Sequence, residues 1–241
     1  LPDPFLDFHR SFPAMTRAQA IAQAEQCFDS GAFRTLLARR LALPTESQNP
    51  DRAAVLADYL ESEMRPAFEA LGFTCRTLTH PKALAPFLYA ERIEDPALPT
   101  VLGYGHGDVI RGLEREWKEG LSPWALTESE GRWYGRGIAD NKGQHSINME
   151  ALRLVLETRG KLGFNAKYLI EMGEETGSMG LRELCTEHRD LMAADLLIAR
   201  QMATHEVVGN ERFLHFTPQG RAVSVQRGYN EARQGSNTRA L

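Results

Sequence analysis

The alternation of helix and strand signals constrains the fold of this chain more than any other feature. Helical periodicity covers residues 17–43, with an N-cap predicted at Thr16 and a break near Ser30, and it returns over residues 49–72. Further along, strands are predicted at 73–79, 87–91, 100–105, 166–172 and 195–199, a hairpin at 124–137, and helices at 147–160 and 181–192. Short strands that alternate with helices predict a layered α/β domain.

Apolar spacing within two of these helices predicts which side chains share a face. The helix over residues 49–72 is expected to place on one face Leu56, Tyr59, Leu60 and Met64. The helix over residues 147–160 has at helical spacing Ile147, Ala151, Leu154 and Val155.

Length, charge and cysteine content exclude several classes of protein. A chain of 241 residues is long enough for one sizeable core. Its net charge of -4 disfavours nucleic-acid binding, which a basic excess would favour. Neither a long apolar run nor a charged-then-apolar leader is present, so we predict a soluble cytoplasmic protein without a membrane partner. Three cysteines without close pairing predict ordinary thiols rather than a disulfide framework.

Polar side chains gather where the predicted strands end. His106 and Asp108 follow the strand over 100–105 and project to the same side. Asp140 and Lys142 lie in a glycine-flanked loop before a helix, and the adjacent Glu174 and Glu175 follow the strand over 166–172. Ligands of open α/β sheets bind beyond the strand ends, so we expect these groups to share one crevice.

Each of these groups also has an ordinary interpretation on its own. A surface His beside an Asp is often only solvated, Asp140 could cap the following helix, and adjacent glutamates usually form a solvated face. Their joint occurrence at strand ends favours a metal site instead. Imidazole with carboxylates suits zinc, manganese or cobalt, and a bridging carboxylate could hold two ions roughly 3.5 to 4 Å apart.

Three ordered motifs within residues 99–199 resemble a known family. The segments "GHGDV", "WYGRGIADNKGQ" and "EMGEETGSMGL" are similar to those of the dinuclear zinc peptidases and amidohydrolases, which include carnosine and cytosolic dipeptidases, acetylornithine deacetylase, succinyl-diaminopimelate desuccinylase, aminoacylase and glutamate carboxypeptidase. The segment around the hairpin looks nearest to the dipeptidase-like branch. The resemblance implies a three-layer α/β domain with a mostly parallel central sheet flanked by helices, incomplete here at its C-terminal part.

The resemblance also implies residue roles. His106 would bind one Zn²⁺, Asp140 would bridge both ions, and Glu175 would bind the second, with Co²⁺ or Mn²⁺ as alternatives. Asp108 would orient His106, and Glu174 would be the general base. A non-proline cis peptide bond is implied after Asp140. The implied substrate is a small peptide or an N-acyl amino acid, and members of the family are often homodimers.

The chain departs from the family pattern after residue 199. Arg200 and Gln201 stand where an acidic ligand is expected, and no lid or dimerisation domain is recognisable in 200–241. We therefore assign 1–199 to the N-terminal part of the catalytic domain and 200–241 to an unmatched tail, explained by a truncation or a change of reading frame. The histidines that remain in the tail, His205 and His215, are not expected to be ligands.

Two functions remain open from the sequence. The first is a metal-dependent hydrolase that cleaves a peptide or N-acyl amide bond with a metal-activated water and a glutamate base. The second is a catalytically defective fragment that keeps the fold without a complete metal site. With Asp140 shared, each ion would have only two protein ligands, which predicts weak metal binding by this chain. A flavodoxin-like binding module is disfavoured because no phosphate-binding glycine loop is present.

Overall fold

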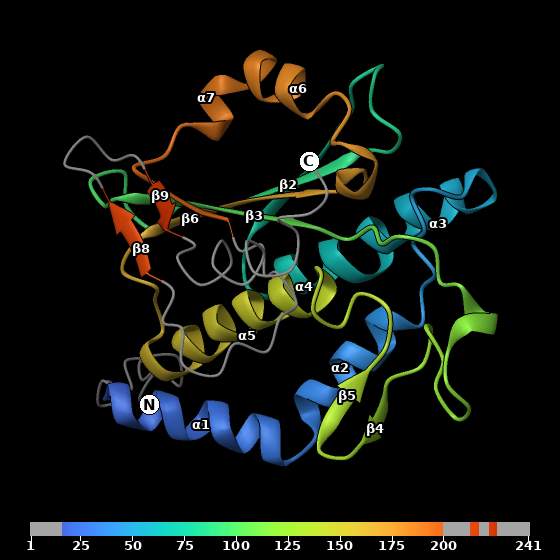
Figure 1. Ribbon diagram of the computed structural model, residues 1–241. Coiled ribbons are helices and arrows are strands. Elements are labelled where there is room, and N and C mark those ends of the chain that lie inside the picture. Colours follow the sequence, from blue (N-terminus) through green and yellow to red (C-terminus); the bar gives the residue numbers. More distant parts are fainter. Residues whose placement is uncertain (1–15, 200–212, 217–221, 226–241) are drawn as a thin grey trace, which may run out of the picture.

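The computed structural model describes residues 16–199, 213–216 and 222–225, and it contains a five-stranded central sheet (Figure 1). The strands lie in the order β1-β2-β6-β3-β7. Their bounds are β1 Thr74–Leu78, β2 Phe87–Arg92, β3 Thr100–His106, β6 Asn165–Glu171 and β7 Leu196–Ala199. β3 pairs in parallel with both β6 and β7, and β2 pairs antiparallel with β1 and β6. Within this sheet only β2 runs opposite to the others, so the predicted mostly parallel sheet is confirmed.

Helices cover both faces of the sheet, which gives the predicted three layers (Figure 1). One face carries α3 (Ala53–Asp58), the π-helix η2 (Tyr59–Met64), α4 (Arg65–Ala70) and α5 (Lys142–Arg159). The opposite face carries α6 (Leu181–Glu187) and α7 (Arg189–Met192). α1 (Arg17–Asp29) and α2 (Ala32–Leu41) pack outside α5.

The alternation of side chains along β6 explains why two cores form. Every residue of this middle strand is buried. Tyr168 and Ile170 point into the larger core with α4 and α5, whereas Leu169 points into the smaller core beneath α6. Burial of each such side chain contributes about 1.5 to 3 kcal/mol, so the sheet is anchored from both sides.

The N-terminal helices form where the sequence predicts them. Thr16 caps α1 in a capping box with Gln19, and Gly31, with a φ of 78°, separates α1 from α2. The helix predicted over 49–72 is divided into the 3-10 turn η1 (Pro50–Arg52), α3, η2 and α4. Its predicted face is buried, with relative exposures of 0 to 1% at Leu56, Tyr59, Leu60 and Met64.

The apolar face predicted for the helix over 147–160 is partly wrong. α5 begins at Lys142, and Ile147 is 46% exposed while Ala151 is also exposed. Leu154 is buried and Val155 packs against the core, as predicted, and the core also contains Met149 and Leu152, which were not predicted. The first turn of α5 is also buried, from Lys142 to Ser146, so the buried face of this helix includes polar residues that apolar spacing does not mark.

The remaining elements are short. β4 (Thr127–Ser129) and β5 (Arg132–Tyr134) form the predicted hairpin, and Glu130 and Gly131 both take positive φ at its turn. The other 3-10 turns are η3 (Glu114–Glu116) and η4 (Glu174–Thr176). In the tail, β8 (Phe213–Phe216) pairs with β9 (Ala222–Val225). Among the described residues, no helix is both long and apolar enough to cross a membrane.

Candidate metal centre

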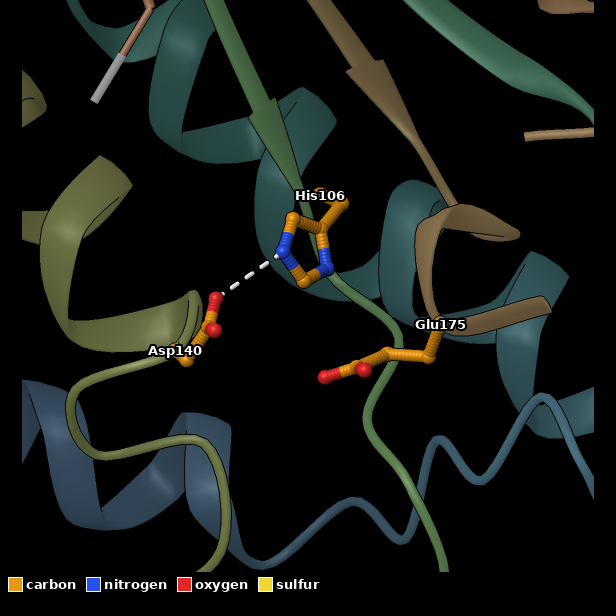
Figure 2. Close-up of side chains that lie close together, drawn as sticks. All are labelled: His106, Asp140 and Glu175. Carbon is orange, nitrogen blue, oxygen red and sulfur yellow. Dashed lines mark hydrogen bonds and ion pairs between the residues drawn. The ribbon is translucent and has the colours of Figure 1, made fainter. Parts of the chain in front are cut away.

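The parallel register of β3 and β6 brings two of the predicted motifs to the same edge of the sheet. His106, the last residue of β3, lies opposite Glu171, the last residue of β6. The loop after β6 therefore carries Glu174 and Glu175 beside the loop that follows His106. Asp140 reaches the same place from the start of α5, and Figure 2 shows its carboxylate facing the ring of His106, with Glu175 alongside.

Among the residues that the structure describes, three potential ligand groups converge at this edge. One donor atom from each of His106, Asp140 and Glu175 lies within 4.8 Å of the others. Asp140 Oδ1 is 3.1 Å from His106 Nε2. The imidazole is fully buried, whereas the Asp140 side chain is 41% exposed. The cluster is thus buried on the side of His106 and open to solvent on the side of Asp140.

Glu174 lies next to this cluster, farther from the imidazole than Asp140 is. Its Oε2 atom is 3.8 Å from His106 Nε2, and its side chain is 24% exposed. The two adjacent glutamates therefore differ in geometry: Glu175 completes the cluster, and Glu174 lies beside it within reach of water.

Asp108 connects the loop after β3 with the loop after β6. Its Oδ1 is 3.2 Å from His106 Nδ1. The same carboxylate accepts the backbone N–H of Glu174 at 3.2 Å and that of Glu175 at 3.1 Å. The orienting contact to His106 that the resemblance implies is present, and the contacts to the glutamate loop were not predicted.

The charges of this cluster perturb one another. Burial by itself would lower the pKa of His106, but hydrogen bonds to Asp108 and Asp140 outweigh it and raise the pKa to about 10. Burial, together with the charges of Asp140 and Glu174, raises the pKa of Glu175 to about 7 despite the opposing effect of His106. Such a group of carboxylates would ionise more easily beside a cation.

The residues around Asp140 have separate roles. The N-cap of α5 is Asn141, so the alternative in which Asp140 caps this helix is wrong. The peptide bond between Asp140 and Asn141 is cis, as the resemblance implies. Lys142 points away from the cluster and donates to the carbonyls of Arg40 at 3.0 Å and Leu43 at 2.6 Å, and its burial lowers its pKa to about 7. Lys142 therefore anchors α5 to the end of α2.

Sequence reasoning missed a polar segment at residues 45–49. Thr45 Oγ1 donates to the Gly107 carbonyl at 2.6 Å, and Val109 N–H donates to the Thr45 carbonyl at 2.9 Å. Gln48 Nε2 reaches the Glu175 carbonyl at 3.3 Å. The segment thus holds both loops of the cluster, and only the polar run after Pro44 could have indicated it.

The prediction that the tail supplies no metal ligand is not tested. Gln201 and His205 lie outside the described residues, and so does the side chain of His215.

An imidazole and carboxylates gathered beyond the parallel strands of an α/β sheet form an arrangement that could hold a divalent metal ion. Residues 102–218 match the model of Peptidase family M20/M25/M40, which confirms the resemblance predicted from the three motifs.

Known proteins of similar sequence include dipeptidases. The Beta-Ala-His dipeptidase of Mus musculus is 38% identical over 108 residues, which are 44% of this chain and 22% of that protein. The Cysteinylglycine-S-conjugate dipeptidase of Corynebacterium striatum is 40% identical over 101 residues, 41% of this chain and 22% of that protein.

The fold is similar to that of solved dipeptidases. Human carnosine dipeptidase 1 superimposes with a TM-score of 0.68 at 26% identity, covering 78% of this chain and 41% of that structure. Dug1p from Saccharomyces cerevisiae gives a TM-score of 0.65 at 21% identity, covering 76% of this chain and 40% of that structure, which supports the fold alone. The chain therefore spans under half the length of the relatives it matches.

Proposed function

We propose that the protein is a metal-dependent hydrolase that cleaves the peptide or N-acyl amide bond of a small substrate. The convergence of His106, Asp140 and Glu175 within 4.8 Å is the observation that carries this proposal. The similarity to metallopeptidases of known fold supports it.

The donor set fits a divalent metal ion. Imidazole nitrogen and carboxylate oxygen are ligands that zinc accepts, and manganese and cobalt accept them as well. His106, Asp140 and Glu175 would hold the metal, and the resemblance to the family implies that Asp140 would be the ligand shared in a two-metal site. When bound, the metal would polarise the scissile carbonyl and make the attacking water more acidic.

The protein groups have distinct tasks in this proposal. Glu174 is the general base: it takes a proton from the attacking water and gives it to the leaving amine. Its position 3.8 Å from His106 Nε2 leaves it beside the ligands, and its partial exposure gives water access. Asp108 keeps the imidazole oriented and holds the glutamate loop in register with it.

The substrate is proposed to be a dipeptide or a molecule of similar size. The relatives named as dipeptidases support this choice over a long peptide. A cytoplasmic location, the absence of a nucleic-acid or membrane partner, and the possibility of homodimers stay predictions.

The test is hydrolysis of a panel of dipeptides and N-acyl amino acids with zinc, and again with a chelator. Glu174→Gln is expected to lower turnover by about 10² to 10⁴-fold while zinc binding is retained, because it removes a proton acceptor without removing a ligand. Glu25→Gln on α1 is the control.

An unchanged rate in Glu174→Gln would refute the role of Glu174. Substoichiometric zinc and no turnover in the 241-residue chain would support the alternative, a catalytically defective fragment that retains the fold without a complete metal site.

A further inference from the structure

Behind the candidate ligands lies a group of buried polar side chains that the proposed reaction does not use. Tyr59, Asn141 and His145 are 0%, 1% and 1% exposed. Tyr59 comes from the π-helix η2, and the other two come from the start of α5. Buried polar groups in folded proteins are almost always hydrogen-bonded, so partners are expected for these three side chains.

These side chains form a connected chain of hydrogen bonds that ends at a ligand. The Tyr59 hydroxyl is 2.7 Å from His145 Nε2, and His145 Nδ1 is 3.3 Å from Asn141 Oδ1. The same Asn141 oxygen accepts the backbone N–H of His106 at 3.3 Å. Asn141 Nδ2 donates to Gln144 Oε1 at 2.9 Å, which fixes the orientation of the amide.

The chemistry of these atoms fixes the direction of each bond. An amide oxygen only accepts, so His145 Nδ1 must carry the proton that it shares with Asn141. The other nitrogen of a neutral imidazole then accepts, and Tyr59 donates to it. Burial, with the nearby positive groups Arg40 and His106, lowers the pKa of His145 far below its usual value, which keeps the ring neutral. Burial raises the pKa of Tyr59, so its hydroxyl keeps the proton.

Close packing holds this group against β3. A Cβ atom added to Gly105 would lie 3.1 Å from Asn141 Oδ1 and 3.2 Å from His145 Cβ. The ring of Tyr59 also meets the ring of His145 edge-on, with centroids 6.0 Å apart. The hydrogen bonds therefore act between elements that already have little room to move.

We propose that His145 is a positioning residue: with Tyr59 and Asn141 it fixes the backbone of His106 relative to the first turn of α5, and thereby the spacing of His106 and Asp140. The consequence for metal affinity rests on the proposed function, whereas the hydrogen-bonded arrangement does not. Groups that orient metal ligands typically change affinity about 10 to 100-fold when removed.

The first test measures the nitrogen chemical shifts of the His145 ring in the metal-free 241-residue chain. The signals of His145 are assigned as those that disappear from the spectrum of His145→Gln. The expected result is a neutral ring protonated at Nδ1. A ring protonated at Nε2, or a charged ring near neutral pH, would overturn the proposal.

The second test is calorimetric zinc titration of Tyr59→Phe against Tyr168→Phe. Both substitutions remove one hydroxyl from a tyrosine of the same core, but only Tyr59 contacts His145. Tyr59→Phe is expected to weaken zinc binding about tenfold, with the fold retained by circular dichroism, and Tyr168→Phe to leave it unchanged.

Equal zinc affinity in Tyr59→Phe and the wild-type chain would refute the positioning role. If the wild-type chain bound no zinc, the proposed function would fail, and the protonation of His145 would still decide the arrangement.

Discussion

Asp108 joins two parts of the chain that are far apart in sequence. Its carboxylate contacts the ring of His106 and accepts the backbone N–H groups of Glu174 and Glu175. Because it is fully buried, it has no water to replace a lost partner. The position of the glutamate pair therefore depends on the same side chain that orients the imidazole.

Replacing Asp108 with Asn should disturb both loops together. The amide has the same shape but one acceptor oxygen fewer, and its NH₂ group would face a donor. We expect a loss of about 1 to 3 kcal/mol in the free energy of unfolding and zinc binding weaker by about 10 to 100-fold. Urea unfolding and calorimetry measure the two effects, and a variant with wild-type zinc affinity would argue against the joint role.

Glu175 should give the metal-free protein a measurable pH dependence. Its pKa is raised from its ordinary value to about 7, so the folded state holds a proton that the unfolded state has released. This contribution to stability is fully present at low pH and is lost as pH rises through about 7. Glu175→Gln has no such proton. Its free energy of unfolding should therefore rise relative to that of the wild type as the pH increases from about 5 to about 8. A difference that stays constant with pH, measured with chelator present, would contradict the raised pKa.

At the scale of elements, β3 brings the ligands close by having glycines on the face toward α5 and the core. A Cβ on Gly103 would lie 2.3 Å from Tyr168 Cε1, and one on Gly105 would meet Asn141 and His145. The first glycine makes room for the core, and the second makes room for the group that holds His106.

Gly103→Ala and Gly105→Ala should therefore separate stability from metal binding. Each is expected to cost about 1 to 3 kcal/mol through overpacking. Only Gly105→Ala should also weaken zinc binding, because the helix start that carries Asp140 must shift. Thermal unfolding and calorimetry on both variants test this, and a matching loss of zinc affinity in Gly103→Ala would show that the effect is general destabilisation.

The elements also show why some residues could be predicted and others could not. The motifs around His106, Asp140 and Glu175 are local, since each is an apolar or glycine-rich segment followed by acidic groups. Tyr59 and His145 carry no such local signal, because a tyrosine at helical spacing resembles any core residue. They become partners only through packing between segments 86 residues apart. The same holds for α5, where apolar spacing marks Ile147, which is exposed, and does not mark the buried polar residues of the first turn.

At the scale of the whole molecule, the sheet order places the loops after β3 and β6 next to each other, although their motifs are far apart in the chain. The alternation of helices and strands predicts this arrangement, because parallel strands end at a common edge. With Asp140 shared, the three motifs predict only two protein ligands for each ion. The three groups that meet here are few for two ions, so the expectation of weak metal binding by this chain stays a prediction.

Zinc titration of Glu174→Gln and Glu175→Gln, beside the wild-type chain, tests the central claim most directly. The two substitutions make the same chemical change, carboxyl to amide, at neighbouring residues, so they compare two positions beside the same cluster. Glu175→Gln should weaken zinc binding at least about tenfold, whereas Glu174→Gln should leave it nearly unchanged. Equal affinities in the two variants, or a wild-type chain that binds no zinc, would contradict a metal centre built from His106, Asp140 and Glu175.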